Sequence, residues 1–179
     1  MSEGDFGPDL AELVQSLLRD VPDFPIPGIA FKDIVPLLAD AAAFSRCVAA
    51  LAGESGEVDV VAGVEARGFI LAGAMAQFLG AGLVPIRKAG KLPPPTIARE
   101  YALEYGTATI EVPVDVLAGK RVLLVDDVLA TGGTLRAAAD LIVQAGGKIA
   151  EIGVLLELAA LNGRDVVGDV APTRALLRV

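Results

Sequence analysis

The sequence predicts an α/β fold: a doubly wound, mainly parallel sheet flanked by helices, with a small N-terminal hood. Three observations predict it. A buried-strand pattern at 121–125 is followed by a glycine-rich loop and a helical pattern, and a second strand–loop–helix unit begins near Val58. The 179 residues suffice for one domain with a full core, built mainly of Ala, Val, Leu and Ile because aromatic residues make up only 4%. Alternating strands and helices are typical of a parallel sheet covered on both faces.

Composition narrows the chemistry and the partners. The net charge of −8 argues against non-specific binding to nucleic acid. The chain contains no His, which excludes His acid–base chemistry and His metal sites, and its single Cys47 cannot form an internal disulfide. No apolar run of about eighteen residues and no signal-peptide core occur. We therefore expect a soluble cytoplasmic protein without a membrane partner.

The N-terminal segment predicts a helix and then an irregular stretch. Pro8 suits the first turn of a helix whose apolar face contains Leu10, Leu13, Val14, Leu17 and Leu18. Two prolines and a glycine predict no regular element over 24–33. Phe31 lies in this stretch, and taken alone it is better explained as an aromatic plug of the core than as a binding residue.

Two helices and a strand are predicted next. A helix over 41–52 would place Phe44, Val48 and Leu51 on one face, with Cys47 nearby as a small core residue. A strand over 58–62 leads into a loop that contains Arg67, and a second helix runs from near Gly68 to Leu79. A surface Arg is usually just solvated, but this loop would face the ligand-binding edge of the sheet.

A cluster of cations and a long loop follow. A strand over 83–86 precedes Arg87, Lys88 and Lys91, which form either a solvated turn or a ligand site at the carboxyl end of a parallel strand. Residues 91–106 are rich in proline and weakly periodic. Long loops in compact domains are usually functional or disordered, so we expect a lid over about 91–107. Residues 107–113 would return as a strand or hairpin arm.

The stretch RVLLVDDVLATGGTLR at 121–136 predicts a sugar-phosphate site. Its strand would end in Asp126 and Asp127, and its loop opens a helix whose free N–H groups and dipole suit a phosphate. The two carboxylates would repel a phosphate unless ribose hydroxyls lay between the carboxylates and the phosphate. The stretch is neither a Walker P-loop nor G-x-G-x-x-G, and the glycines alone would fit an ordinary strand–helix turn. The donors of the loop would be Thr131, Gly132, Gly133 and Thr134.

The C-terminal part completes the alternation. Gly146 and Gly147 would end the helix that follows the loop. A buried strand is predicted over 149–158, a turn over 162–165 and a last short strand over 174–179.

VLLVDDVLATGGTL resembles the 5-phosphoribosyl-1-pyrophosphate (PRPP) signature of type I phosphoribosyltransferases. Further stretches resemble the adenine-specific members of that family: FPIPGIAFKDIVPLL (24–38), GVEARGFILAGAMA (63–76), IRKAGKLP (86–93) and LEYGTATIE (103–111). The resemblance extends from about Phe24 to Leu158. It implies a single domain over 1–179 with a hood over about 1–36. It also implies the purine-salvage reaction of adenine and PRPP to AMP and pyrophosphate.

The resemblance also implies the roles of individual residues. Asp126 and Asp127 would orient the ribose diol, and Glu104 would handle a purine-ring proton, although Glu100 competes with it as a candidate. Contacts to PRPP or AMP would come from Arg67, Arg87, Lys88, Lys91, Ala130, Thr131, Gly132, Gly133 and Thr134. Adenine would stack on Phe31, lie against Val128, and pair with the backbone of Ala30 and Lys32. The implied Mg²⁺ would sit on the substrate with no direct protein ligand, and a homodimer is expected.

Two alternatives stay open. The first is a phosphoribosyltransferase for hypoxanthine–guanine, xanthine or orotate. The 6-oxopurine enzymes usually place a Lys that reads the exocyclic oxygen, and here only Lys148, poorly placed, follows the central motif. The second is a non-enzymatic PRPP sensor, against which the −8 charge and the absence of an appended helix-turn-helix both count.

Overall fold

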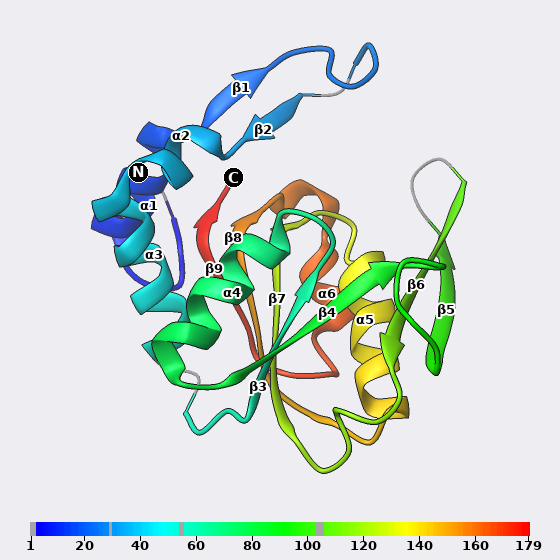
Figure 1. Ribbon diagram of the computed structural model, residues 1–179. Coiled ribbons are helices and arrows are strands. Elements are labelled where there is room, and N and C mark those ends of the chain that lie inside the picture. Colours follow the sequence, from blue (N-terminus) through cyan, green and yellow to red (C-terminus); the bar gives the residue numbers. More distant parts are fainter. Residues whose placement is uncertain (1–2, 29, 54–55, 103–105) are drawn as a thin grey trace.

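The computed structural model describes residues 3–28, 30–53, 56–102 and 106–179. Within them the chain forms a seven-stranded sheet, in the order β5-β6-β4-β3-β7-β8-β9, and a separate two-stranded sheet near the N-terminus (Figure 1). The five strands from β4 to β9 in that order run parallel, and β5 and β6 form an antiparallel edge. Helices cover both faces, which confirms the predicted doubly wound, mainly parallel fold.

The elements have the following bounds. The main sheet contains β3 (Val60–Val64), β4 (Gly82–Lys88), β5 (Thr96–Ala102), β6 (Thr107–Pro113), β7 (Arg121–Leu129), β8 (Lys148–Glu157) and β9 (Thr173–Arg178). The small antiparallel sheet pairs β1 (Arg19–Val21) with β2 (Phe31–Asp33). The helices are α1 (Pro8–Leu17), α2 (Val35–Ala39), α3 (Ala41–Gly53), α4 (Gly68–Leu79), α5 (Gly133–Gln144), the 3₁₀ turn η1 (Ala159–Leu161) and α6 (Gly163–Val167).

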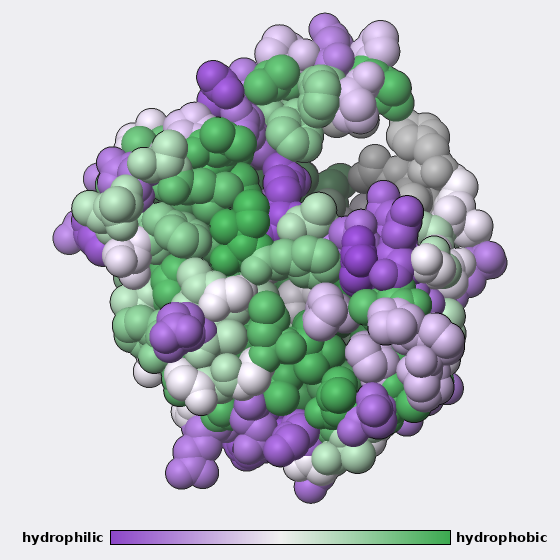
Figure 2. All heavy atoms as spheres, viewed as in Figure 1, coloured by the Kyte–Doolittle hydropathy of each residue, from purple (hydrophilic) through white to green (hydrophobic). Residues whose placement is uncertain are grey.

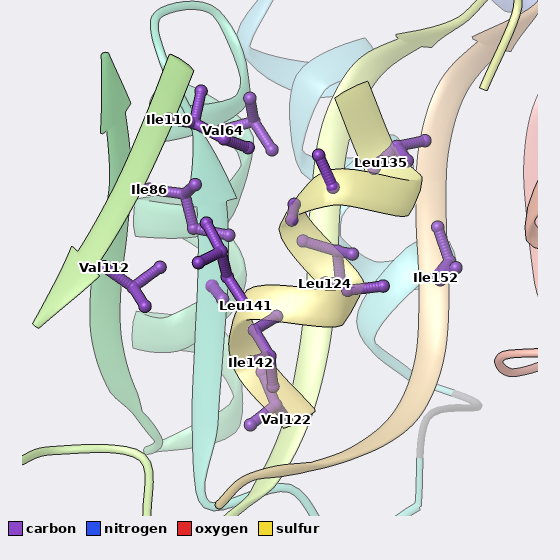
Figure 3. Close-up of a cluster of buried hydrophobic side chains, with 14 of the residues drawn as sticks. Val64, Ile86, Ile110, Val112, Val122, Leu124, Leu135, Leu141, Ile142 and Ile152 are labelled. Carbon is purple, nitrogen blue, oxygen red and sulfur yellow. The ribbon is translucent and has the colours of Figure 1, made fainter. Parts of the chain in front are cut away.

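Each face of the sheet buries its own hydrophobic cluster. On one face, Leu141 and Ile142 of α5 point at Leu124 of β7 and its neighbours (Figure 3). On the other face, α1, α3 and α4 cover the sheet, with Cys47 buried among them as predicted. Because β3 and β7 are buried on both sides, their sequences are continuous apolar runs rather than alternating ones. Complete burial of one Leu such as Leu124 stabilises the fold by roughly 2 kcal/mol.

The predicted helices are confirmed, and two strands prove longer than predicted. The strand expected to end at the acid pair continues through Asp126 and Asp127 to Leu129, because β8 keeps pairing with it. Similarly, β4 includes Arg87 and Lys88, because the antiparallel strand β6 extends its hydrogen bonding there.

Three irregular stretches prove to contain regular structure. Residues 31–33, predicted to be irregular, form β2, because the prolines at 25 and 27 precede its pairing with β1. The predicted loop over 91–106 contains β5, which pairs with β6 along its whole length. The predicted turn over 162–165 opens the short helix α6. These differences arise from pairing and packing with distant segments, which local periodicity does not encode.

The β1–β2 sheet stands away from the main sheet, above the carboxyl ends of the parallel strands (Figure 1). A hollow separates it from the main body (Figure 2). Strand β1 follows α1, which packs against β9 and α3. No helix in the described part of the chain is long and apolar enough to span a membrane.

Candidate active site

Several predicted site residues meet where the β1–β2 sheet faces the carboxyl edge of the main sheet. Arg67, in the turn after β3, lies with its Nη2 2.8 Å from Oδ2 of Asp127. Its Nη1 donates a hydrogen bond of 3.1 Å to the carbonyl oxygen of Lys32, and its guanidinium lies 4.7 Å from the ring centre of Phe31. One guanidinium therefore connects the small sheet with the acid pair of β7.

The acid pair is buried. Asp126 is 9% exposed and Asp127 5%. Burial raises the pKa of Asp126 well above its ordinary value, and the neighbouring Asp127 charge raises it further. Burial also raises the pKa of Asp127, although the Arg67 charge opposes this shift. Buried carboxylates are stabilised by hydrogen-bond donors, so a ligand carrying hydroxyl groups suits this pair.

The glycine-rich loop after β7 is preformed. Gly132 has a φ of +84°, and a Cβ on it would lie 2.6 Å from the carbonyl oxygen of Gly163, so glycine is required for two reasons. A Cβ on Gly133 would lie 3.1 Å from the carbonyl oxygen of Ala102 in β5. The loop is thus packed between α6 and β5. It encloses a pocket of about 50 Å³ lined by Val128, Leu129, Ala130, Thr131, Gly132, Thr134 and Leu135.

This pocket has the features of an anion site. It lies where β7 passes into α5, and the N–H groups of the first turn of a helix lack partners within the helix. Together with the helix dipole, such groups favour a phosphate or another anion. The acid pair lies on the same strand a few residues earlier, so a phosphate and a hydroxyl-bearing group could be bound side by side.

The end of β4, with Arg87 and Lys88, is held by a glutamate that sequence reasoning overlooked. Oε2 of Glu65 accepts a hydrogen bond of 2.9 Å from the backbone N–H of Lys88 and lies 3.4 Å from Nε of Arg87. These contacts lower the pKa of Glu65, the Lys88 N–H contributing most. Arg87 also donates from Nη1 to the carbonyl oxygen of Lys91 at 2.9 Å. The sequence did contain a signal for the role of Glu65, because this charged residue stands directly before Ala66 and Arg67 in the loop.

A second overlooked acid, Glu111 of β6, organises the turn at Lys91 and Leu92, which follows β4. Its Oε1 accepts hydrogen bonds from the backbone N–H groups of Lys91 and Leu92 at 2.9 and 2.8 Å, and its Oε2 accepts one from Thr96 at 3.2 Å. The Leu92 N–H contributes most to lowering the pKa of Glu111. Glu111 lies inside an apolar strand and is only 5% exposed. A glutamate in such a position indicates a carboxylate that accepts hydrogen bonds from the protein itself.

The residues predicted to bind adenine come from two parts of the fold, the start of β2 and strand β7. Phe31 is half-buried and meets Phe24 edge to face, with ring centres 5.1 Å apart. Next to it, Lys32 pairs through Nζ with Asp20 at 2.6 Å. Ala30 precedes β2, whereas Val128 lies on β7 and packs against the cluster beneath α4. Stacking of a base between Phe31 and Val128 stays a prediction.

The predicted proton-transfer residue, Glu104, lies outside the described residues, so its role also stays a prediction. The described strand before it, β5, ends at Ala102, next to Gly133 of the glycine-rich loop after β7. Among the described residues, no group of three or more His, Cys, Asp or Glu side chains is placed to hold a metal ion.

Comparisons with known proteins decide the family. The family model of the phosphoribosyl transferase domain matches residues 37–170. The adenine phosphoribosyltransferase of Acidothermus cellulolyticus is 56% identical over 174 residues, which cover 96% of this chain and 98% of that protein. The chain belongs to the adenine phosphoribosyltransferase family.

Solved structures of adenine phosphoribosyltransferases share the fold. The enzyme of Rhodothermus marinus matches with a TM-score of 0.91 and 44% identity, covering 96% of this chain and 99% of that one. The enzyme of Giardia lamblia, solved in complex with 9-deazaadenine, matches with a TM-score of 0.90 and 42% identity, covering 95% and 97%. Both matches cover nearly the whole of this chain.

Proposed function

We propose that this protein transfers the 5-phosphoribosyl group of PRPP to N9 of adenine, releasing AMP and pyrophosphate in purine salvage. The observation that carries the proposal is the buried pair Asp126 and Asp127 on the strand that leads into the preformed phosphate loop. Membership of the adenine phosphoribosyltransferase family selects adenine as the base. The crystallised Giardia relative was solved with an adenine analogue, which supports the same choice.

The ribose end of PRPP determines the geometry of the proposed reaction. Ala130, the backbone N–H groups of 131–134 and the hydroxyls of Thr131 and Thr134 would hold the 5′-phosphate. Asp126 and Asp127 would accept hydrogen bonds from the ribose diol. As the bond from C1′ to the pyrophosphate oxygen breaks and the bond to adenine N9 forms, positive charge develops on the ribose. Two fixed carboxylates stabilise that charge.

The pyrophosphate would bind on the opposite, cationic side of the site. Arg67, Arg87, Lys88 and Lys91 would surround it, held in place by Glu65 and by the backbone contacts described above. In the structure, Nη2 of Arg67 lies 2.8 Å from Oδ2 of Asp127. When PRPP binds, the diol would take over Asp127 while the pyrophosphate takes over the guanidinium, so both charges stay compensated.

Adenine would enter the hollow beneath the β1–β2 sheet. Phe31 would stack on one face of the purine and Val128 would contact the other. The backbone of Ala30 and Lys32 would read the edge of the base, which offers both donors and acceptors. Glu104 would transfer a proton on the purine ring and thereby make N9 a better nucleophile.

Magnesium fits this site as a substrate-bound ion. The available protein donors are carboxylate oxygens, which suit Mg²⁺, but within the described residues no third acid joins Asp126 and Asp127. The pyrophosphate and the ribose hydroxyls of PRPP would therefore supply its ligands, and the protein would supply none directly. Bound there, Mg²⁺ neutralises the charge of the leaving pyrophosphate.

We further propose a single catalytic domain, with a hood over about 1–36 and a lid over about 91–107 carried by the β5–β6 hairpin. Closure of the lid would exclude water from the cationic ribose. We also propose a cytoplasmic homodimer. An apolar groove of about 550 Å³ between α3 and α4, where Phe78 is 57% exposed, supports the dimer (Figure 2).

The test is AMP formation from adenine and PRPP in the presence of Mg²⁺, with hypoxanthine, guanine, xanthine and orotate as competing bases. Glu104→Ala should lower kcat by roughly 100-fold or more while PRPP still binds. Glu100→Ala is the matched control, since it removes a carboxylate from the same arm, and should leave kcat nearly unchanged. Absence of AMP formation by the wild type would contradict the proposed reaction.

A further inference from the structure

Helix α6 lies directly against the backbone of the phosphate loop. A Cβ on Gly163, the first residue of α6, would overlap the carbonyl oxygen of Ala130 and lie 2.9 Å from the nitrogen of Gly132. Conversely, a Cβ on Gly132 would lie 2.6 Å from the carbonyl oxygen of Gly163. The two backbones therefore approach each other closely, with the side chains of Leu129 and Val166 beside the contact. The path of the loop therefore depends on where α6 is held.

The residue after Gly163 holds α6 from three directions. Arg164 donates from Nε to Oε2 of Glu157 at 3.0 Å, from Nη1 to the carbonyl oxygen of Thr173 at 2.7 Å, and from Nη2 to Oδ2 of Asp5 at 2.8 Å. Glu157 ends β8 and is only 3% exposed. The hydrogen bonds to Glu157 contribute most to raising the pKa of Arg164. One guanidinium thus fastens α6 to β8, β9 and the N-terminal segment.

The other end of α6 is fastened to the helix that the phosphate loop opens. Arg136 of α5 donates from Nη1 to the carbonyl oxygen of Val166 at 3.2 Å and to Oδ1 of Asp169 at 2.8 Å. Because both ends of α6 are tied to surrounding elements, Gly163 has little freedom to move away from the loop. None of the residues that make these contacts is among those that line the pocket over 128–135.

We propose that Arg164 is a positioning residue for PRPP. By holding Gly163 beneath residues 130–132, it keeps the loop in the conformation that presents its N–H groups to the 5′-phosphate. The inference rests on the proposed function, because it takes the 5′-phosphate as the ligand of this loop. Arg164 would act through α6, since its own donors are occupied by Glu157, Thr173 and Asp5.

The test compares Arg164→Met with Arg174→Met. Arg174 also pairs with a buried glutamate, since its Nε lies 3.2 Å from Oε2 of Glu151, but this pair joins the beginnings of β8 and β9, away from the loop. We expect Arg164→Met to raise the KM for PRPP about tenfold, because misplacing a binding group by a fraction of an ångström is costly. The KM for adenine and the kcat at saturating PRPP should change less than about threefold. Arg174→Met should change none of these constants.

Two further measurements keep the result unambiguous. Titration with ribose 5-phosphate should show weaker binding to Arg164→Met than to Arg174→Met, whether or not turnover is affected. Arg164→Lys keeps the charge but cannot reach three acceptors in a fork, so it should raise the KM for PRPP by about threefold and serves as the test if the Met variant fails to fold. If the Arg164 variants lose thermal stability but keep wild-type PRPP and ribose 5-phosphate affinity, the inference is overturned. A wild type that binds ribose 5-phosphate but forms no AMP would contradict the proposed reaction and leave this comparison intact.

Discussion

The carboxyl-terminal end of β7 with its following turn and the turn after β3 lie side by side at one edge of the sheet, yet they hold their carboxylates in opposite ways. Asp127 of β7 is buried, and burial raises its pKa despite the neighbouring Arg67. Glu65, after β3, accepts the Lys88 N–H and pairs with Arg87, and these contacts lower its pKa. Oδ2 of Asp127 is ion-paired with Arg67 but has no hydrogen-bond partner, whereas the carboxylate of Glu65 accepts a backbone N–H beside its ion pair.

This difference indicates what each turn does. An undersupplied carboxylate such as that of Asp127 gains most from a ligand that brings hydroxyl donors. A satisfied carboxylate such as that of Glu65 gains little from a ligand and instead orients the cation beside it. Residue type alone would have suggested one role for both acids, whereas their hydrogen-bond partners separate them.

The largest expected effect separates the two acids. Asp127→Asn should lower kcat/KM for PRPP by roughly 100-fold, because it removes a charge that stabilises the cationic ribose. Glu65→Gln should lower it only about tenfold, through a higher KM, because it loosens Arg87 without touching the ribose. Steady-state kinetics with PRPP as the varied substrate measures both. Equal losses in kcat for the two variants would remove the proposed division of roles.

The next prediction concerns the contact that joins the two turns. Gly68 opens α4, and a Cβ there would lie 3.0 Å from Oδ1 of Asp126 and 3.1 Å from the carbonyl oxygen of Val125. Gly68→Ala should therefore destabilise the protein by about 1–3 kcal/mol in urea unfolding. Gly73→Ala in the same helix is the control, because a Cβ there meets nothing within 4 Å, and it should be neutral or stabilising by about 0.5–1 kcal/mol. Matching losses for both variants would contradict this packing.

A smaller effect should appear in the pH profile. The carboxylate of Asp127 must be ionised to bind the diol, so activity is lost as the pH falls through its raised pKa. Arg67 is the cation that lowers this pKa, so Arg67→Gln should move the acid limb of kcat/KM to higher pH. Arg87→Gln, which removes a proposed pyrophosphate contact and is not among the causes of the Asp127 pKa shift, should weaken PRPP binding without moving the limb. A shift to lower pH in the Arg67 variant would contradict this account.

The smallest effect concerns the contact between α5 and strand β5. Nη2 of Arg99 in β5 lies 2.8 Å from Oδ2 of Asp140 in α5, and Nε of Arg136 lies 3.1 Å from Oδ1 of the same residue. The pairs are partly exposed, so Asp140→Asn should cost only about 0.5–1 kcal/mol of stability. A double-mutant cycle with Arg99→Met should give a coupling energy of the same small size. Zero coupling would show that the arm is not held there.

The predictable part of the site depends on short stretches of sequence. The acid pair, the Gly-Thr loop and the helix after it follow one another within 121–136, so their order alone predicts a sugar-phosphate site. Glu111 and Arg164 could not be found in this way. Glu111 acts on the backbone of Lys91 and Leu92, and Arg164 on atoms of Asp5 and Thr173, which are distant in the sequence.

The sequence by itself determined the alternation of strands and helices, the two turns with their charged residues, and the need for glycine at the phosphate loop. These are properties of local periodicity and backbone freedom. Only the tertiary structure decided that β5 pairs with β6, that Asp127 is buried against Arg67, and that α6 supports the loop. The physical reason is that burial, and with it the pKa of a carboxylate or the clearance around a glycine, is created by segments that meet only when the chain has folded.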